Sequence, residues 1–305
     1  MEKKKIKVLN IIITLFILFI VIEVLLRVIF GFCNAVLYKE DQDLEYIAIP
    51  QSTKRFGNRI FYNTYSQRNS EIAPEDSIII AGFGDSVLNG GTLSDNEDLA
   101  TTKLSKYLSS KEKKNVKVLN VSCKSWGPDN CYAYIKKYGD FNAKAMFLVM
   151  SSHDVHDIMN FDKVVGVNPG WPKEQYDFAL SELMHRYILP RISTSKNENA
   201  LNDKLGINLS KSDTTFNPGI RNLFEYSKQK NIPFLIYLHA DLNEVQQNEY
   251  SEGGKLVEDF CKKNNIYLIK ELDYDLSQEI YSDDIHFTNK GQDEMFRILK
   301  DEIYK

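Results

Sequence analysis

Three side chains in this sequence are of the types that build a nucleophilic hydrolytic site. Ser86 follows the apolar run 77–83, and Asp283 and His286 stand three residues apart near the C-terminus. A serine hydroxyl is a weak nucleophile at neutral pH, so it needs a base within hydrogen-bond reach and a third group that orients the base. We therefore predict that Ser86 attacks a carbonyl carbon, that His286 takes its proton and that Asp283 orients the imidazole.

Short apolar runs rich in β-branched residues are the elements that must position these side chains. Most of them are separated by helical stretches, at 99–113, 129–138, 217–230 and 243–263. Strands that alternate with helices indicate a parallel sheet covered on both faces. The predicted strands are Ser77 to Phe83, Val116 to Ser122, Ala145 to Met150, Pro233 to His239 and Ile266 to Ile269.

The carboxyl ends of these strands gather the candidate residues. Open parallel sheets place their sites at the C-terminal ends of strands, near the point where strand order reverses. Ser86, Ser125, His153 and His239 all follow such ends. For His239 a structural role and a place in the pocket both stay open, and the structural role is favoured.

Two short segments of this sequence resemble conserved motifs of the SGNH or GDSL hydrolases. The first is Gly-Asp-Ser-Val at 84–87 and the last is Asp-Asp-Ile-His at 283–286, and the likeness covers about 76–304. The resemblance implies a three-layer α/β/α, flavodoxin-like fold with a five-stranded parallel sheet in the order 2-1-3-4-5. It also implies catalysis by Ser86, Asp283 and His286 without a cofactor.

The same resemblance implies where the oxyanion donors come from. Segment 118–129 looks like the family's second block, with Ser125 where a glycine is expected, and segment 147–154 looks like the third, with His153 where an asparagine is expected. A backbone N–H donates from serine as from glycine, and a histidine ring nitrogen can donate as an amide does. We expect an oxyanion hole built from the N–H of Ser86, the N–H of Ser125 and the side chain of His153.

The pattern His153-Asp-Val-His-Asp157 also invites a metal interpretation, because imidazole and carboxylate both bind zinc or iron. The sequence has no further histidine or cysteine cluster to complete such a site, and the segment already serves as the end of the third strand. We predict no metal. Asp85 is expected to brace its own loop by accepting backbone hydrogen bonds.

The N-terminus has the pattern of a membrane anchor. Lysines crowd residues 1–7, and an apolar run follows through Glu23 and Arg27 to Phe32. Twenty-five residues of helix extend about 37 Å, enough to cross a hydrocarbon core of about 30 Å. The lysines predict a single-pass helix with its N-terminus in the cytoplasm and the catalytic domain on the far side. A cleaved signal peptide is the alternative, but the run is long and no small-residue cleavage site follows.

The chain divides into three parts on this reading: an anchor at 1–33, a linker or edge segment at 34–75, and a hydrolase domain at 76–305 with an insertion at about 155–216. The linker is aromatic-rich and is expected to pack against the domain edge. A helix is expected over 173–187, and Trp171 and Tyr176 fit either a sugar-stacking wall or, more simply, a small satellite core. Glu23 and Arg27 can pair on one helix face, and the simpler interpretation, which is favoured, is that both side chains snorkel at the end of the helix.

Composition excludes some partners and leaves others open. A net charge of −4 and the absence of a basic patch argue against nucleic acid. The four cysteines fit no metal motif, and an oxidised Cys123–Cys131 pair in an exported domain stays open. Oligomeric state is not predicted.

The sequence thus favours serine-dependent ester hydrolysis or acyl transfer. The predicted membrane anchor, and what the resemblance implies for anchored members of the family, point to acetyl esters of a cell-envelope polysaccharide. Two alternatives stay open: a lipid acylhydrolase of the lysophospholipase type, and a catalytically inert component that binds or assembles envelope polysaccharide. The expected partners are an acylated carbohydrate or lipid and the membrane.

Overall fold

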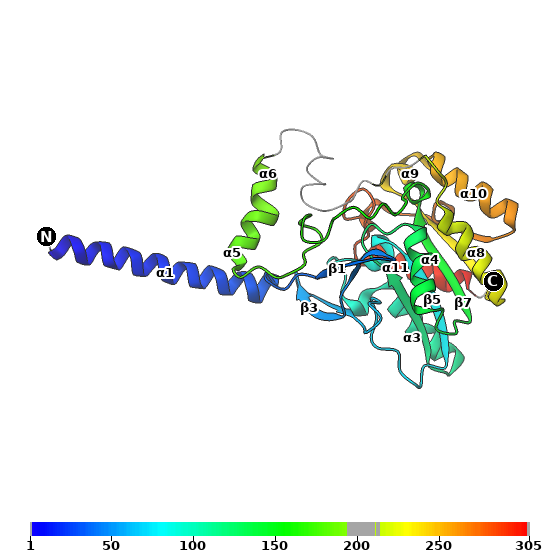
Figure 1. Cartoon of the computed structure of the whole chain (residues 1–305), viewed down its shortest axis with the longest axis horizontal. Coiled ribbons are helices and arrows are strands. Elements are labelled where there is room, and N and C mark those ends of the chain that lie inside the picture. Colours follow the sequence, from blue (N-terminus) through cyan, green and yellow to red (C-terminus); the bar gives the residue numbers. More distant parts are fainter. Residues whose placement is uncertain (1, 194–210, 212–213, 304–305) are drawn as a thin grey trace.

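The computed structural model begins with a long helix, α1 (Glu2–Phe30), that stands apart from the rest of the chain (Figure 1). The structure describes residues 2–193, 211 and 214–303. Within the 26 residues Lys5–Phe30, the most apolar window of 18 residues has a mean hydropathy of 2.9 and none of it is buried, so this helix is long and apolar enough to cross a membrane.

A five-stranded parallel sheet forms the centre of the domain. Its strands are β5 (Ile78–Gly84), β6 (Val116–Ser122), β7 (Ala145–Ser151), β8 (Phe234–His239) and β9 (Tyr267–Lys270), hydrogen-bonded in the order β6-β5-β7-β8-β9. All four pairings are parallel, with Gly84 opposite Ser122 and Ser151 opposite His239. The predicted fold class and the 2-1-3-4-5 order are confirmed, and each predicted strand lies within a residue or so of an observed one.

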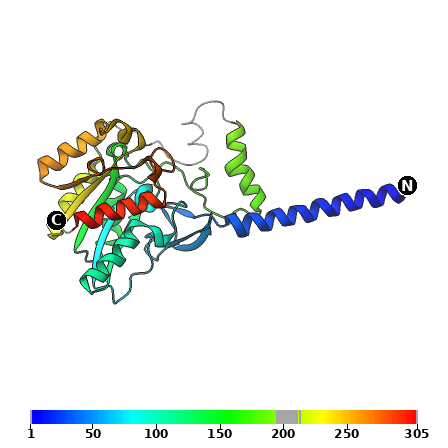
Figure 2. The same cartoon turned by 180° about the vertical axis from the view of Figure 1, so that it is seen from behind.

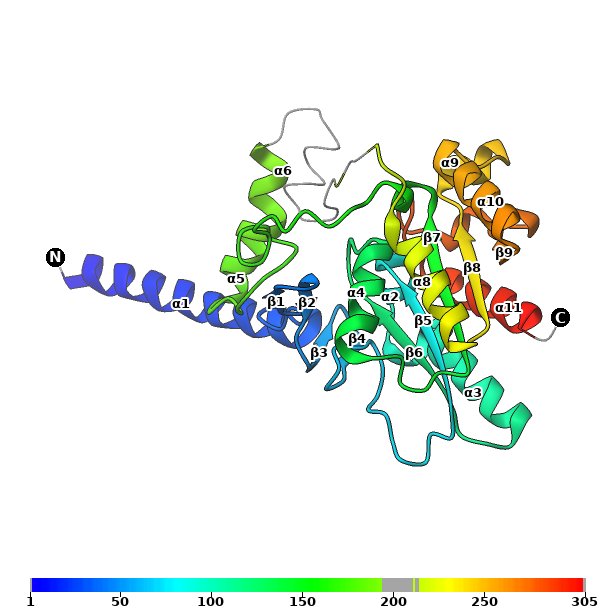
Figure 3. The same cartoon turned by 45° about the vertical axis from the view of Figure 1, so that its right-hand side comes forward.

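Helices cover both faces of this sheet (Figures 2 and 3). One face carries α3 (Ala100–Glu112) and α11 (Asn289–Glu302), which contact each other, together with the short α2 (Ser86–Asn89). The other face carries α4 (Pro128–Tyr138), α8 (Pro218–Lys230) and α10 (Glu252–Asn264). The resulting three layers place the carboxyl ends of the strands at one edge of the molecule.

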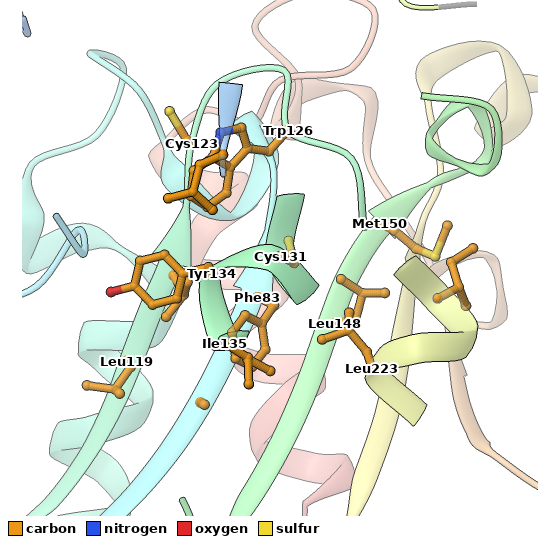
Figure 4. Packing of buried hydrophobic residues seen from close by; sticks show 14 of the residues in the cluster. Phe83, Leu119, Cys123, Trp126, Cys131, Tyr134, Ile135, Leu148, Met150 and Leu223 are labelled. Atoms are coloured by element: carbon orange, nitrogen blue, oxygen red, sulfur yellow. The ribbon is translucent and has the colours of Figure 1, made fainter. Parts of the chain in front are cut away.

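The core on the α4 and α8 side shows why these sequences fold into layers. Phe83 and Leu148 project from β5 and β7 against Ile135 of α4 and Leu223 of α8 (Figure 4). All four are at most 2% exposed. Strands buried on both faces read as continuous apolar runs, which is the pattern that the sequence has at 77–83 and 145–150.

The segment 34–75 forms two β-hairpins: β1 (Tyr38–Asp41) pairs with β2 (Glu45–Ala48), and β3 (Gln51–Arg55) with β4 (Asn58–Tyr62). The first hairpin packs on the domain, because Tyr46 donates from its hydroxyl to the carbonyls of Lys124 and Ser125. Tyr38, Tyr46 and Tyr62 of the segment join the main core, whereas Phe56 and Tyr65 are exposed, and the segment packs against the domain.

The described part of the insertion contains a helix with three segments: α5 (Ala179–Glu182), the π-helical η3 (Leu183–Ile188) and α6 (Leu189–Ser193). The helix expected over 173–187 thus begins six residues later, after Phe178. Trp171 is fully buried against Tyr38 and Tyr46, so it belongs to the core and forms no open stacking wall. Most of the polar tract 193–215 lies outside the described residues.

One predicted helix is two in the structure. The stretch 243–263 divides into α9 (Leu242–Gln247) and α10, because Asn248 adopts a left-handed conformation and Ser251 begins a new helix. Short 3₁₀ turns lie at η1 (Asn96–Asp98), η2 (Ser152–Val155), η4 (Glu271–Asp273) and η5 (Gln278–Ile280).

Candidate active site

Ser86 lies at a sharp turn between a strand and a helix. It is the first residue of α2, directly after β5 and Asp85. Asp85 is the N-cap, and its carboxylate accepts a hydrogen bond from the N–H of Val87 at 2.8 Å, which is the bracing role expected from the sequence. Gly84 has no room for a side chain, since a Cβ there would lie 3.0 Å from the Val149 carbonyl and 2.9 Å from Leu88. The turn therefore presents Ser86 at the carboxyl edge of the sheet.

The loop 281–287 brings the histidine to that edge. The Nε2 of His286 lies 2.9 Å from the Oγ of Ser86, although the two residues are 200 positions apart. On the other side of the ring, Nδ1 lies 2.8 Å from a carboxylate oxygen of Asp283. A carboxylate only accepts, so Nδ1 carries the proton and Nε2 is left to accept from the serine hydroxyl. The three residues predicted from the sequence thus lie in one hydrogen-bonded chain.

Asp283 is held as a carboxylate. Partial burial raises its pKa, but hydrogen bonds from the His286 ring and from the backbone N–H groups of Ile285 and His286 lower the pKa to about 2. The charge of Asp283 is therefore present throughout the neutral range, where it stabilises an imidazolium on His286.

A second histidine holds this loop from beneath. His239 is fully buried at the end of β8, with Nδ1 2.6 Å from Glu271 and Nε2 2.8 Å from the carbonyl of Ile285. Burial lowers its pKa, but the charge and hydrogen bond of Glu271 and the Ile285 carbonyl raise the pKa to about 9. His239 therefore donates to the loop between Asp283 and His286. Of the two roles left open for His239, the structure supports the structural role.

The sequence analysis missed Glu271, the partner of His239. This buried carboxylate also accepts from the hydroxyl of Tyr237 and from the N–H of Ala240. No local motif marks it. A glutamate directly after an apolar strand was the only signal present.

A cavity of about 310 Å³ opens beside Ser86. Ser86, Asp283 and His286 line one part of it. Another part, the wall, is lined by residues between α1 and β1, of the second hairpin and of η3, namely Ala35, Val36, Arg55, Phe56, Arg186 and Tyr187. The sequence analysis did not predict that the linker and the insertion would form this wall.

Two guanidinium groups of the wall share one carboxylate. Arg55 and Arg186 lie 2.6 and 2.9 Å from Glu182, which is fully buried and also accepts from the backbone N–H of Cys33. Nearby, burial and then the charge of Arg186 lower the pKa of Lys124 to about 7. This side of the cavity is therefore positively charged and closely packed.

The two other candidate residues lie at the same edge of the sheet but outside the lining of the cavity in the described chain. Ser125 has a left-handed backbone, φ 54°, which is the conformation for which the family's glycine is suited. His153 is half-exposed in η2, with Nε2 3.3 Å from Asp154. Their roles as oxyanion donors stay a prediction.

A group of three possible metal ligands also lies here. Asp85, His153 and Asp154 each offer an atom within 4.8 Å of the others, whereas His156 contacts the carbonyl of Thr215 instead. Burial and the neighbouring charge of Asp85 raise the pKa of Asp154 well above its usual range. Both carboxylates already have structural tasks, since Asp85 caps α2 and Asp154 accepts from the N–H of Ser151. We therefore assign no metal to them.

Cys123 and Cys131 are both buried in this structure, and each has a free thiol. Burial raises the pKa of Cys123 to about 12, which keeps it a thiol.

With Ser86 after β5, the 283–286 loop after β9, and the strand order β6-β5-β7-β8-β9, the chain has the three-layer α/β/α, flavodoxin-like fold that the resemblance to the SGNH or GDSL hydrolases implied. An acetyl xylan esterase is similar to it with a TM-score of 0.44 and 14% identity, over 74% of this chain and 100% of that one. A member of the lipolytic G-D-S-L family from Veillonella parvula has a TM-score of 0.40 and 9% identity, over 75% and 100%. A lipase/acylhydrolase from Enterococcus faecalis has 0.41 and 13%, over 74% and 95%. No family model matches the sequence, and no curated protein matches it.

Proposed function

We propose that this protein is a membrane-anchored serine esterase or O-acyltransferase. The observation that carries the proposal is the hydrogen-bonded chain from Ser86 through His286 to Asp283, with contacts of 2.9 and 2.8 Å. A serine, a histidine in the correct tautomer and an orienting carboxylate are the three parts that nucleophilic acyl transfer requires.

In the proposed first step, the Ser86 oxygen attacks an ester carbonyl carbon while His286 Nε2 takes the hydroxyl proton. The carbonyl oxygen becomes an oxyanion, for which the N–H of Ser86, the N–H of Ser125 and the His153 side chain are the proposed donors. The tetrahedral intermediate then expels the alcohol, which takes the proton from His286 as the carbon–oxygen bond breaks. Ser86 is left acylated.

The second step separates an esterase from a transferase. Water attacks the acyl group in an esterase and a sugar hydroxyl does so in a transferase, and in both His286 accepts the proton of the attacking group and returns it to Ser86. The two outcomes differ in how well water is excluded and in whether an acceptor is bound.

For the substrate we propose acetyl esters on a cell-envelope polysaccharide. The small cavity beside Ser86 suits a short acyl group, and the apolar helix α1 suits a protein tethered where envelope polymers are made. We propose that α1 spans the membrane with the lysine-rich end in the cytoplasm and the domain outside it.

A lipid ester is the second candidate, and one observation favours it. Ala35 and Val36 line the cavity only a few residues after the end of α1, so the site lies close to the proposed membrane. A comparison of p-nitrophenyl acetate with a long-chain p-nitrophenyl ester distinguishes the two: faster hydrolysis of the acetate favours the polysaccharide ester, and faster hydrolysis of the long-chain ester favours the lipid.

The test of the proposed function is labelling of the full chain, in detergent, with a fluorophosphonate probe. We expect labelling of the wild type and of Ser110→Ala, a matched control at an exposed serine of α3, and none of Ser86→Ala. A folded wild type that takes no label would contradict the proposal and would favour an inert, polysaccharide-binding component instead.

A further inference from the structure

The helix formed by α5, η3 and α6, which we call the arm together with Phe178, begins beside the C-terminal half of α1. Figures 1 and 3 show the arm rising away from α1, with the sheet domain beyond it on the C-terminal side of α1. The arm belongs to the insertion, and about 150 residues separate it from α1 along the chain.

The joint between the two helices is chemically specific. The carboxylate of Glu23 accepts from the N–H groups of Ala179 and Leu180 at 2.7 and 3.0 Å, so a residue of α1 caps the first turn of the arm. Arg27 pairs with Glu23 at 2.8 Å and also donates to the carbonyl of Asp177. A carboxylate at a helix N-terminus is stabilised by the helix dipole. These polar groups are therefore paired with one another, as hydrocarbon surroundings would require.

If α1 spans a membrane, the joint between α1 and the arm lies near the outer boundary of the hydrocarbon core. Counting from the last lysine, Lys7, about twenty helical residues cross a hydrocarbon core of about 30 Å and end near Arg27. Phe178, the residue before the arm's first helical turn, packs on Phe19 with ring centroids 6.1 Å apart. The start of the arm therefore lies at the same depth as the apolar part of α1. If α1 spans a bilayer, this part of the arm contacts the same lipid.

The exposed surface of the arm fits that position. Phe178, Leu189 and Ile192 are 54, 43 and 75% exposed, and Phe178 also packs on Phe19 of α1. The basic side chain of Arg191, next to Ile192 in the chain, is exposed as well. A helix with an apolar side and basic residues is typical of one that lies along a membrane interface. The other side of the arm carries Glu182, Arg186 and Tyr187, which face the domain.

We propose that the arm lies in the membrane interface, on the side of the bilayer that holds the domain, with Phe178, Leu189 and Ile192 in lipid. The proposal rests on the membrane anchor of the proposed function and adds a second contact with the same bilayer. Because Arg186 and Tyr187 of the arm line the cavity beside Ser86, the cavity then opens next to the membrane surface. The site would thus take its ester from a molecule held at that surface.

Tryptophan quenching by brominated lipid tests this placement. The two native tryptophans, Trp126 and Trp171, are at most 1% exposed and give a constant background. The full chain is reconstituted in dioleoyl phosphatidylcholine vesicles, with and without bromine on the acyl chains, as four variants. Phe16→Trp reports on α1, Phe178→Trp and Ile192→Trp report on the arm, and Leu256→Trp is the control, since Leu256 is an exposed leucine on α10, away from α1.

We expect the added emission of the α1 variant and of both arm variants to fall in brominated vesicles, and that of Leu256→Trp to stay unchanged. In the arm variants, bromine near the carbonyl end of the chain should quench more than bromine near its methyl end, because interfacial helices lie about 5–10 Å into the headgroup and acyl boundary. Two arm variants guard against one that misfolds.

Three results would overturn the proposal. Quenching of Phe16→Trp without quenching of either arm variant would remove the arm from lipid and leave the anchor in place. Absence of quenching in Phe16→Trp would remove the anchor and the arm together, while fluorophosphonate labelling would still report separately on the hydrolase. Arm emission that shifts with protein concentration and not with brominated lipid would assign the arm to a second copy of this chain.

Discussion

The catalytic edge of the sheet and the wall of the cavity beside it are built in different ways. At the edge, Asp283 and His286 are three residues apart and their loop is closed by its own hydrogen bonds, such as the one from the Ser282 N–H to the His286 carbonyl. In the wall, Arg55 binds Glu182 across 127 positions, and the backbone of Ala35 exchanges two hydrogen bonds with the Gln175 side chain across 140. Chemistry carried by a short motif is visible in sequence, whereas a wall assembled from distant segments is not.

The largest effect should come from the edge, at Asp283→Asn. An amide cannot fix the His286 tautomer as the carboxylate does, and loss of that function in a triad typically lowers kcat by about 10⁴-fold. Hydrolysis of p-nitrophenyl acetate measures it, with the exposed neighbour Asp284→Asn as the matched control. A rate for Asp283→Asn within tenfold of the control would show that this carboxylate does not orient the base.

Removing the buried carboxylate of the wall should lower the free energy of unfolding. Glu182→Ala leaves the Arg55 guanidinium, 2% exposed, without its carboxylate, and breaking a buried pair in this way costs about 3–5 kcal/mol. Chemical denaturation of the full chain in detergent measures it. Glu225→Ala, which removes an exposed partner of Lys228 on α8, is the control and should cost at most about 1 kcal/mol. Equal losses in both variants would mean that the wall is not held by its buried pair.

His239, which supports the catalytic loop at the sheet edge, should make the stability of the fold depend measurably on pH. Its pKa is raised from 6.5 to about 9, so protonated His239 stabilises the fold fully below about pH 6.5, and this contribution is lost as pH rises through 9. The loss in the free energy of unfolding should be on the order of 3 kcal/mol. Thermal unfolding between pH 6 and 10 should therefore show a slope in the wild type that His239→Gln lacks. The same slope in both proteins would assign the pH dependence to other groups.

The strands of the sheet and the contact of Ser86 with the 283–286 loop could be predicted from the sequence, because apolar strands and short polar blocks are local patterns. The strand order could not be predicted from such patterns and came only from the resemblance to the SGNH or GDSL hydrolases. The spacing of Glu23 and Arg27 allowed the pair that the structure contains, since four residues make about one helical turn, although the sequence favoured two snorkelling side chains. Local patterns did not reveal the capping of the arm by Glu23, the Arg55–Glu182–Arg186 cluster or Glu271. Each of these joins residues whose own neighbourhoods carry no distinguishing pattern, and each exists only once the chain has folded. The prediction of one continuous helix at 243–263 was wrong for a local reason. Asn248 has a left-handed backbone that ends α9, and hydrophobic periodicity does not reveal it.

The smallest effect is expected at Ser125, where the edge departs from the family's pattern. Ser125 holds φ at 54°, a region that costs a residue with a Cβ about 1–2 kcal/mol. Glycine removes that strain but gains freedom in the unfolded chain, so Ser125→Gly should change stability by less than about 1 kcal/mol. Because the proposed oxyanion donor is the backbone N–H, which the variant keeps, p-nitrophenyl acetate should be hydrolysed at nearly the wild-type rate. Ser125→Val is the contrasting variant, since a β-branched residue is a true outlier at positive φ. It should be both less stable and slower in hydrolysis than the wild type. A folded Ser125→Gly that is as slow as Ser125→Val would show that the serine side chain, and not the backbone at this turn, is what the edge needs.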